Sequence, residues 1–123
     1  MAEILYKELS YAVVGAAMEV HQHLGANFLE KVYQKALAHE LTLRQIPFVQ
    51  YKPLPVSYKG LLVGEYEADF MVDGKIILEI KAVSSLHPAH EAQAMHYLAA
   101  TGYRLALLLN FGKESLQQKR VTR

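Results

Sequence analysis

The sequence contains no cysteine, and this absence removes several kinds of chemistry at once. Disulfides, thiolate zinc ligands and cysteine nucleophiles are excluded, which fits a reducing compartment. Long hydrophobic runs are also absent, because no stretch approaches the roughly 18 apolar residues that span a membrane. The apolar stretch 12–18 is too short, and its surroundings too acidic, for a signal peptide. We therefore expect a cytoplasmic protein with no membrane partner.

Charge of either sign is nearly balanced. The formal net charge is +1 at pH 7, so the total gives no argument for a nucleic-acid partner. The balance conceals a separation, because residues 65–79 carry five acids and one lysine whereas residues 104–123 carry five bases and one acid. The acidic segment favours a divalent cation, and the basic segment could contact phosphate.

Several enzyme motifs are missing as well. There is no Gly-x-Ser-x-Gly, no Walker-type phosphate loop and no Gly-x-Gly-x-x-Gly, so the corresponding hydrolases and nucleotide-binding enzymes have no basis here. What is present is enough apolar material for one core, since 52% of the 123 residues are hydrophobic. At this length folding buries roughly 65% of the surface exposed by the unfolded chain. We expect one domain over residues 1–123.

Two amphipathic helices are predicted in the N-terminal third. Apolar residues recur at three- and four-residue steps over 5–24 and 28–44, as a helix with one buried face requires. Gly25 ends the first helix, and Pro47 bars continuation of the second. Glu40 falls near the centre of the second apolar face, which predicts a buried acid with a partner or a ligand.

The next segment favours strands. Residues 48–51 and 56–58 predict a strand with irregular edges, and Lys59-Gly60 predicts a turn. In 65–72 and 75–83 every even position is apolar and the charged residues stand at odd positions. Odd residues must therefore pair with odd residues, so we expect a hairpin with the three-residue loop Val72-Asp73-Gly74 and a left-handed Gly74.

A helix and a strand follow. The helix is expected over 88–101, with Ser85 as its cap and Gly102 at its end. The strand 103–111 is continuously apolar in its centre, as in a mixed or parallel sheet covered on both faces. The tail from Lys113 either adds an edge strand or stays mobile.

The strongest chemical pattern is Asp69 followed ten residues later by Glu79-Ile80-Lys81. The expected hairpin brings these residues together with Glu67 on one face. Such carboxylates can hold Mg²⁺, and the lysine could orient or deprotonate an attacking water. The alternative is an exposed strand face with cross-strand pairs such as Glu65 opposite Lys81.

Other candidates lie on the two later helices. Glu30 stands at the edge of an apolar face and could be a third ligand, although Asn27 to Glu30 also has the spacing of a capping box. His90, Gln93 and Tyr97 share a helical face, where they could contact a phosphate or base or simply pack on the sheet.

Taken together, these patterns resemble the PD-(D/E)XK nuclease superfamily, and more narrowly the GxxExxY family within it. The order helix, three strands, helix, strand carries Asp69 on the second strand and Glu79-Ile80-Lys81 on the third. Other matching segments are Leu24-Gly25, Leu29-Glu30-Lys31-Val32-Tyr33, Ala36-Leu37, Glu40-Leu41, Ile46-Pro47-Phe48, Ala82-Val83, His90-Glu91-Ala92-Gln93, Tyr97 and Asn110-Phe111-Gly112. Asn27 replaces the family's named glycine and Ala68 replaces the proline of the superfamily label, but neither change removes a proposed ligand.

The resemblance implies both a fold and a site. The fold is α/β and restriction-endonuclease-like: an αβββαβ core with a mixed central sheet flanked by helices, plus an extra N-terminal helix. The implied Mg²⁺ site consists of Glu30, Asp69 and Glu79, with Mn²⁺ as a substitute and Lys81 as the catalytic lysine. Gln93 and Tyr97 are similar to a substrate-side motif of RecB-type nucleases, with His90 beside them.

Three hypotheses of function remain open. The first is Mg²⁺-dependent hydrolysis of nucleic acid, DNA rather than RNA, by a metal-activated water. The second is a non-catalytic module that binds nucleic acid or protein and retains the fold. The third is a homodimer or larger scaffold in which the charged strand face is buried against another subunit.

Overall fold

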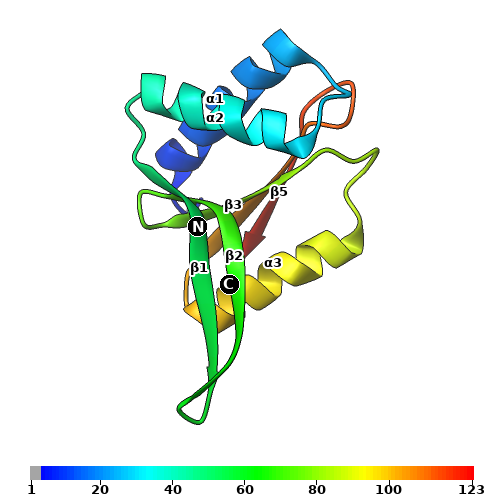
Figure 1. Ribbon diagram of the computed structural model, residues 1–123. Coiled ribbons are helices and arrows are strands. Elements are labelled where there is room, and N and C mark those ends of the chain that lie inside the picture. Colours follow the sequence, from blue (N-terminus) through cyan, green and yellow to red (C-terminus); the bar gives the residue numbers. More distant parts are fainter. Residues whose placement is uncertain (1–3) are drawn as a thin grey trace.

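A five-stranded mixed sheet forms the centre of the computed structural model, which describes residues 4–123 (Figure 1). The strands are β1 (Phe48–Tyr58), β2 (Leu61–Val72), β3 (Ile76–Lys81), β4 (Leu105–Asn110) and β5 (Gln117–Thr122). Their order in the sheet follows the sequence, and only β3 and β4 are parallel. The expected α/β class with a mixed sheet is confirmed.

Helices cover both faces of this sheet (Figure 1). α1 (Lys7–Leu24) and α2 (Glu30–Leu43) lie on one face, and α3 (Pro88–Thr101), which connects the two parallel strands, lies on the other. Each face has its own hydrophobic core, because side chains of β3 and β4 alternate between the two layers. No helix in the described part of the chain is long and apolar enough to cross a membrane.

The two N-terminal helices follow the predicted periodicity, but the start of α2 differs. Gly25 ends α1, as expected, and has a positive φ of 71°. α2 begins at Glu30, with Leu29 as N-cap and no side-chain cap. The capping box of Asn27 and Glu30 is wrong, because Asn27 lies in the left-handed region (φ 79°) before the helix begins. Glu30 is therefore not engaged as a cap.

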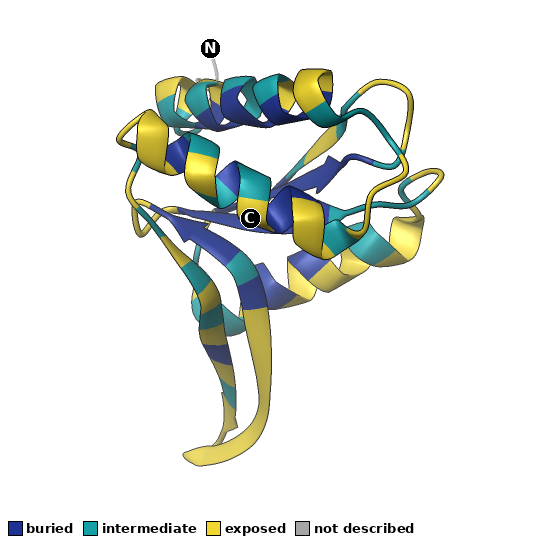
Figure 2. Cartoon of the chain, turned by 45° about the horizontal axis from the view of Figure 1, so that its top comes forward, coloured by how far each residue is buried: buried dark blue, intermediate teal, exposed yellow. Residues whose placement is uncertain are grey.

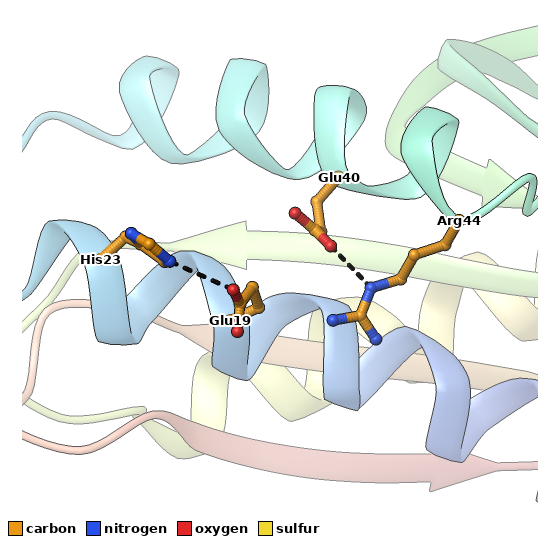
Figure 3. A network of polar contacts seen from close by, with 4 residues as sticks. All are labelled: Glu19, His23, Glu40 and Arg44. Atoms are coloured by element: carbon orange, nitrogen blue, oxygen red, sulfur yellow. Dashed lines mark hydrogen bonds and ion pairs between the residues drawn. The ribbon is translucent and has the colours of Figure 1, made fainter.

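The acid predicted on the apolar face of α2 has a partner. Glu40 is half-buried, and its Oε2 accepts a hydrogen bond from Nε of Arg44 at 2.7 Å. Figure 3 shows this pair beside a second contact on α1, between Glu19 and His23. The guanidinium of Arg44 also packs against Gly15 of α1. This contact pairs Glu40 within the helix layer, away from the sheet.

The β2–β3 hairpin has the predicted parity but a different loop. Met71 pairs with Ile77 and Val72 with Ile76, so odd residues do pair with odd residues. The loop is residues 73–75, one residue later than expected, with left-handed Asp73 and Gly74. The physical reason is burial: Val72 is fully buried, so it stays in the ladder, and the exposed Lys75 takes the loop position.

A long hairpin arm, residues 53–67, extends beyond the body of the sheet (Figure 2). β1 continues through Pro53 and Pro55, which an edge strand tolerates because one side of its backbone needs no partner. The turn at Lys59-Gly60 is confirmed. Residues 61–67 are all exposed, and Glu65 and Glu67 pair with the two prolines. The suggested pair of Glu65 with Lys81 is therefore wrong, and Glu67 lies on the arm.

The C-terminal third contains one corrected cap and one resolved alternative. α3 begins after His87, whose Nδ1 accepts a hydrogen bond from the Ala89 amide, so the expected cap at Ser85 is wrong. Pro88 at the first helical position sets this boundary. The tail forms β5, an edge strand antiparallel to β4.

Candidate active site at the end of the third strand

Asp69 and Glu79 meet where β2 turns away from β3. The ladder between these strands ends at Phe70 and Leu78, and beyond it β2 enters the arm. Beyond the ladder, the Ile80 amide bonds to a side chain of β2: it donates a hydrogen bond to Oδ2 of Asp69 at 2.7 Å. Because Ile80 stands between Glu79 and Lys81, this bond fixes the Asp69 carboxylate beside the last residues of β3.

Glu79 is buried next to that carboxylate. Its side chain is only 4% exposed, and Oε1 has no hydrogen-bond partner among the described residues. Burial raises the pKa of Glu79 to about 9, and repulsion and hydrogen bonding with Asp69 add to the rise in pKa while Lys81 opposes it. A buried carboxyl group with one unpartnered oxygen and a neighbouring carboxylate is costly in its charged form. It therefore keeps a proton at neutral pH unless a cation approaches.

Glu30 and Lys81 belong to the same electrostatic cluster. Burial raises the pKa of Glu30, and Asp69 raises this pKa further, whereas Lys81 and Lys31 lower it. Glu30 comes from the first turn of α2, Asp69 from β2, and Glu79 and Lys81 from the end of β3. The fold thus places these four residues close enough to act on one another through their charges.

The donor set fits a divalent cation held through few protein ligands. Within residues 4–123, no three histidine, aspartate or glutamate side chains converge closely enough to hold one ion. Mg²⁺ usually keeps several waters and is held by one or two carboxylates. The unpartnered Oε1 of Glu79 beside Asp69 suits this mode, and Glu30 is near enough to act on the pKa of Glu79.

A tyrosine of α3 lies near Asp69 and Glu79, which we call the acidic pair. Tyr97 is 6% exposed, and its ring centroid lies 5.1 Å from that of Tyr66 on β2. Burial raises the pKa of Tyr97 to about 12, and Glu79 and then Asp69 contribute to this pKa. The hydroxyl therefore stays protonated and can donate a hydrogen bond toward the carboxylates.

The other two predicted residues of α3 are placed differently. His90 belongs to the helix cap, because its Nδ1 accepts a hydrogen bond from the His87 amide at 3.0 Å. Burial lowers the pKa of His90, and Lys81 and then His87 lower this pKa further, so His90 is near Lys81. Gln93 is exposed. Of the three residues expected to share a face, Tyr97 alone is buried beside the acidic pair.

Comparison with known proteins identifies the family. The PD-(D/E)XK nuclease superfamily matches residues 7–123, nearly the whole chain. The chain belongs to this superfamily. A solved structure, the alkaline exonuclease LHK-Exo from Laribacter hongkongensis, is similar with a TM-score of 0.57 and 14% identity, covering 100% of this chain and 72% of that one. At this identity the similarity shows a shared fold. No curated protein matches the chain.

The sequence patterns did not predict a role for Asn110, the last residue of β4. This residue was noted only within the matching segment Asn110-Phe111-Gly112. In the structure it is fully buried and hydrogen-bonds to the backbone that follows β3. The available signal was a single polar residue that closes the otherwise apolar strand 105–109. A buried polar residue in that position requires partners.

Proposed function

We propose that this protein hydrolyses phosphodiester bonds in nucleic acid, with DNA as the favoured substrate and Mg²⁺ as the cofactor. One observation carries the proposal: in a nuclease superfamily member, the buried and unpartnered carboxylate oxygen of Glu79 lies beside Asp69. Ionised together, these two neighbouring carboxylates would repel each other. A divalent cation would compensate both negative charges.

Each residue has an assigned task in this proposal. Asp69 and Glu79 would hold the cation, with Glu30 from α2 as the proposed third ligand. When bound, the cation supplies a more acidic water and neutralises charge on the phosphate. Lys81 orients that water and offsets the charge that develops in the transition state.

The substrate side of the proposal rests on α3. The Tyr97 hydroxyl donates a hydrogen bond to the acidic pair or to a phosphate of the substrate. Gln93, which is exposed on the same helix, contacts the nucleic acid from the solvent side. His90 keeps the first turn of α3 in place near Lys81. These assignments make the sheet end the catalytic side and α3 the substrate side.

Finer statements about relatives and setting belong to the same proposal. We place the protein in the GxxExxY family on the segments Leu29-Glu30-Lys31-Val32-Tyr33 and Asn110-Phe111-Gly112. We also propose a cytoplasmic location, Mn²⁺ as a substitute for Mg²⁺, and a homodimer as the assembly to be examined.

A cleavage assay tests the function. Wild type, Asp69→Asn, Glu79→Gln and Lys81→Met are compared on single- and double-stranded DNA and on RNA, with Mg²⁺, with Mn²⁺ and with EDTA. We expect each substitution to reduce cleavage by at least about 100-fold, as removal of a charge-stabilising group at a preorganised site does. Glu67→Gln is the matched control, because this acid is exposed on the arm.

The outcomes separate the three hypotheses. Equal cleavage by all variants would indicate a contaminant and overturn the assignment. Nucleic-acid binding without cleavage by the wild type would favour the non-catalytic module. A wild type that forms a dimer, buries Asp69 and Glu79 against its partner and neither binds nor cleaves nucleic acid would favour the scaffold.

A further inference from the structure

Asn110, the last residue of β4, uses its whole side-chain amide in hydrogen bonds. Its Oδ1 accepts from the amides of Val83 and Gly112, both at 3.0 Å. Its Nδ2 donates to the Val83 carbonyl at 3.0 Å and to Oε1 of Gln117 at 3.1 Å. Both donors and both acceptor positions of the amide are therefore occupied. Such complete satisfaction of a fully buried side chain fixes its surroundings.

Gln117 adds a hydrogen bond to a second residue of the segment that follows β3. It is the first residue of β5 and pairs with Asn110 across the ladder. Its Oε1 also accepts a hydrogen bond from the Leu86 amide at 3.1 Å. Asn110 and Gln117, which we call the amide pair, thus hold both ends of the connector 83–86 between β3 and α3.

Two further contacts hold the backbone after β3 close to the end of β4. The Phe111 amide donates to the Lys81 carbonyl at 2.9 Å. Gly112 lies so close to the connector that a Cβ there would be 2.3 Å from the Val83 carbonyl oxygen. The backbone that follows Lys81 consequently has no space to shift toward β4.

The connector joins the two halves of the candidate site. Lys81 precedes it on β3, and α3 with Tyr97 follows it. In the described part of the chain the amide pair forms no hydrogen bond with Asp69 or Glu79, so its route to the site is the connector. We propose that Asn110 and Gln117 are positioning residues that fix Lys81 and Tyr97 relative to Glu79. This inference rests on the proposed hydrolytic function.

The chemistry of Gln117 provides a matched pair of variants. Both of its contacts use Oε1 as an acceptor. Gln117→Glu keeps an acceptor oxygen of the same reach, whereas Gln117→Met has similar length and no such acceptor. A role limited to filling space would be served equally by both substitutions.

Steady-state kinetics and crystal structures of both variants test the proposal. We expect Gln117→Met to lower kcat about tenfold or more with KM changed less than about twofold, since small displacements of positioned groups reduce the chemical step. Gln117→Glu retains kcat within about threefold of wild type by the same reasoning. In the crystals, Tyr97 is displaced relative to Glu79 in Gln117→Met alone.

A stability control distinguishes positioning from general destabilisation. Ser10→Ala removes a fully buried hydroxyl that accepts from Arg120 and donates to the Lys7 carbonyl, far from the connector in the sequence and on another element. We expect it to lower the urea midpoint while kcat stays unchanged. Equal losses of kcat in both Gln117 variants, or a loss of kcat in Ser10→Ala, would overturn the proposal.

Failure of the hydrolytic function can be recognised separately. If the wild type cleaves no substrate, the proposed function fails. The crystal comparison still decides the positioning claim: a displaced Tyr97 in Gln117→Met supports it, and an undisplaced Tyr97 overturns it.

Discussion

The surroundings of Glu79 change the pKa of its carboxyl group. It is buried beside Asp69, and burial is the first reason for a pKa of about 9. Without a cation it is neutral at pH 7. Binding of a cation must therefore displace its proton, which links metal affinity to pH.

The raised pKa of Glu79 predicts that the free energy of unfolding falls as pH rises. Between the ordinary value of 4.5 and the folded value of about 9 for Glu79, the native state holds a proton that the unfolded chain releases. The contribution is therefore complete below pH 4.5 and is lost as pH rises toward 9, by at most about 1.4 kcal/mol per pH unit. Urea unfolding in EDTA at pH 6 and pH 8 measures it. We expect Glu79→Gln to remove this decline and the control Glu67→Gln to keep it; identical declines in both variants would contradict the assignment.

Gly112 carries a second prediction at this scale. Any Cβ here would overlap the backbone of Val83, at 2.3 Å from its oxygen and 2.4 Å from its nitrogen. Gly112→Ala must push two backbone segments apart, which we expect to lower the free energy of unfolding by about 1–3 kcal/mol. Gly64→Ala is the control, because nothing lies within 4 Å of its added Cβ. Chemical denaturation of both proteins checks the difference, and equal stability would contradict the close approach.

At the scale of elements, the hairpin arm combines one buried side chain with a solvent-exposed tip. Leu54 near its base is 1% exposed and packs with residues of α3, whereas Leu62 near its tip is 57% exposed. We expect Leu54→Ala to cost about 2–5 kcal/mol of unfolding free energy. Leu62→Ala should change it by less than about 0.5 kcal/mol. Thermal or urea unfolding compares the two variants; a large loss in Leu62→Ala would mean that the tip is covered.

The arm also shows how far local patterns predict an element. Alternation correctly predicted strands and the parity of their pairing, because neighbouring side chains of a strand point to opposite faces. It did not predict where β2 leaves the sheet. Tyr66 and Ala68 contact the α3 side, whereas Phe70 and Val72 belong to the core under α1 and α2. The change of face near Asp69 depends on partners distant in the sequence, so no local period reveals it.

At the scale of the molecule, Arg120 ties the two ends of the chain together. Its guanidinium donates to Ser10 Oγ at 2.9 Å and to the Leu5 carbonyl at 2.6 Å. The neighbouring Lys119 forms an exposed pair with Glu91 at 3.4 Å. Two charged residues of the basic segment expected to contact phosphate are therefore engaged in contacts with other parts of the same chain.

This connection predicts that α1 unfolds together with the sheet. Arg120→Met leaves two acceptors without their charged donor, and we expect a loss of about 1–3 kcal/mol. Lys119→Met should cost less than about 1 kcal/mol, because exposed ion pairs contribute little. Urea unfolding followed by circular dichroism checks both values. A separate early transition of helical signal in the wild type would contradict the shared unfolding.

The candidate site could be predicted only in part. Asp69, Glu79 and Lys81 followed from their spacing on adjacent strands, and Glu30 from its place at the edge of a helical face. Glu67 was assigned to the same cluster by alternation, but it lies on the arm. Asn110 stood out only as the polar end of an apolar strand and as part of a family segment, and Gln117 had no local signal. Their proposed roles arise from hydrogen bonds to a connector about 30 residues earlier.

By itself the sequence determined the three helices, the central hairpin with its parity and the apolar strand that follows α3, because periodicity and turn residues act between near neighbours. Tertiary structure alone decided the loop position at residues 73–75, the departure of the arm, and the proton held by Glu79. Each of these depends on burial: Val72 is drawn into the ladder, Glu67 is left in water, and Glu79 is removed from water beside Asp69. Burial is set by segments that are distant along the chain, so it exists only once the chain has folded.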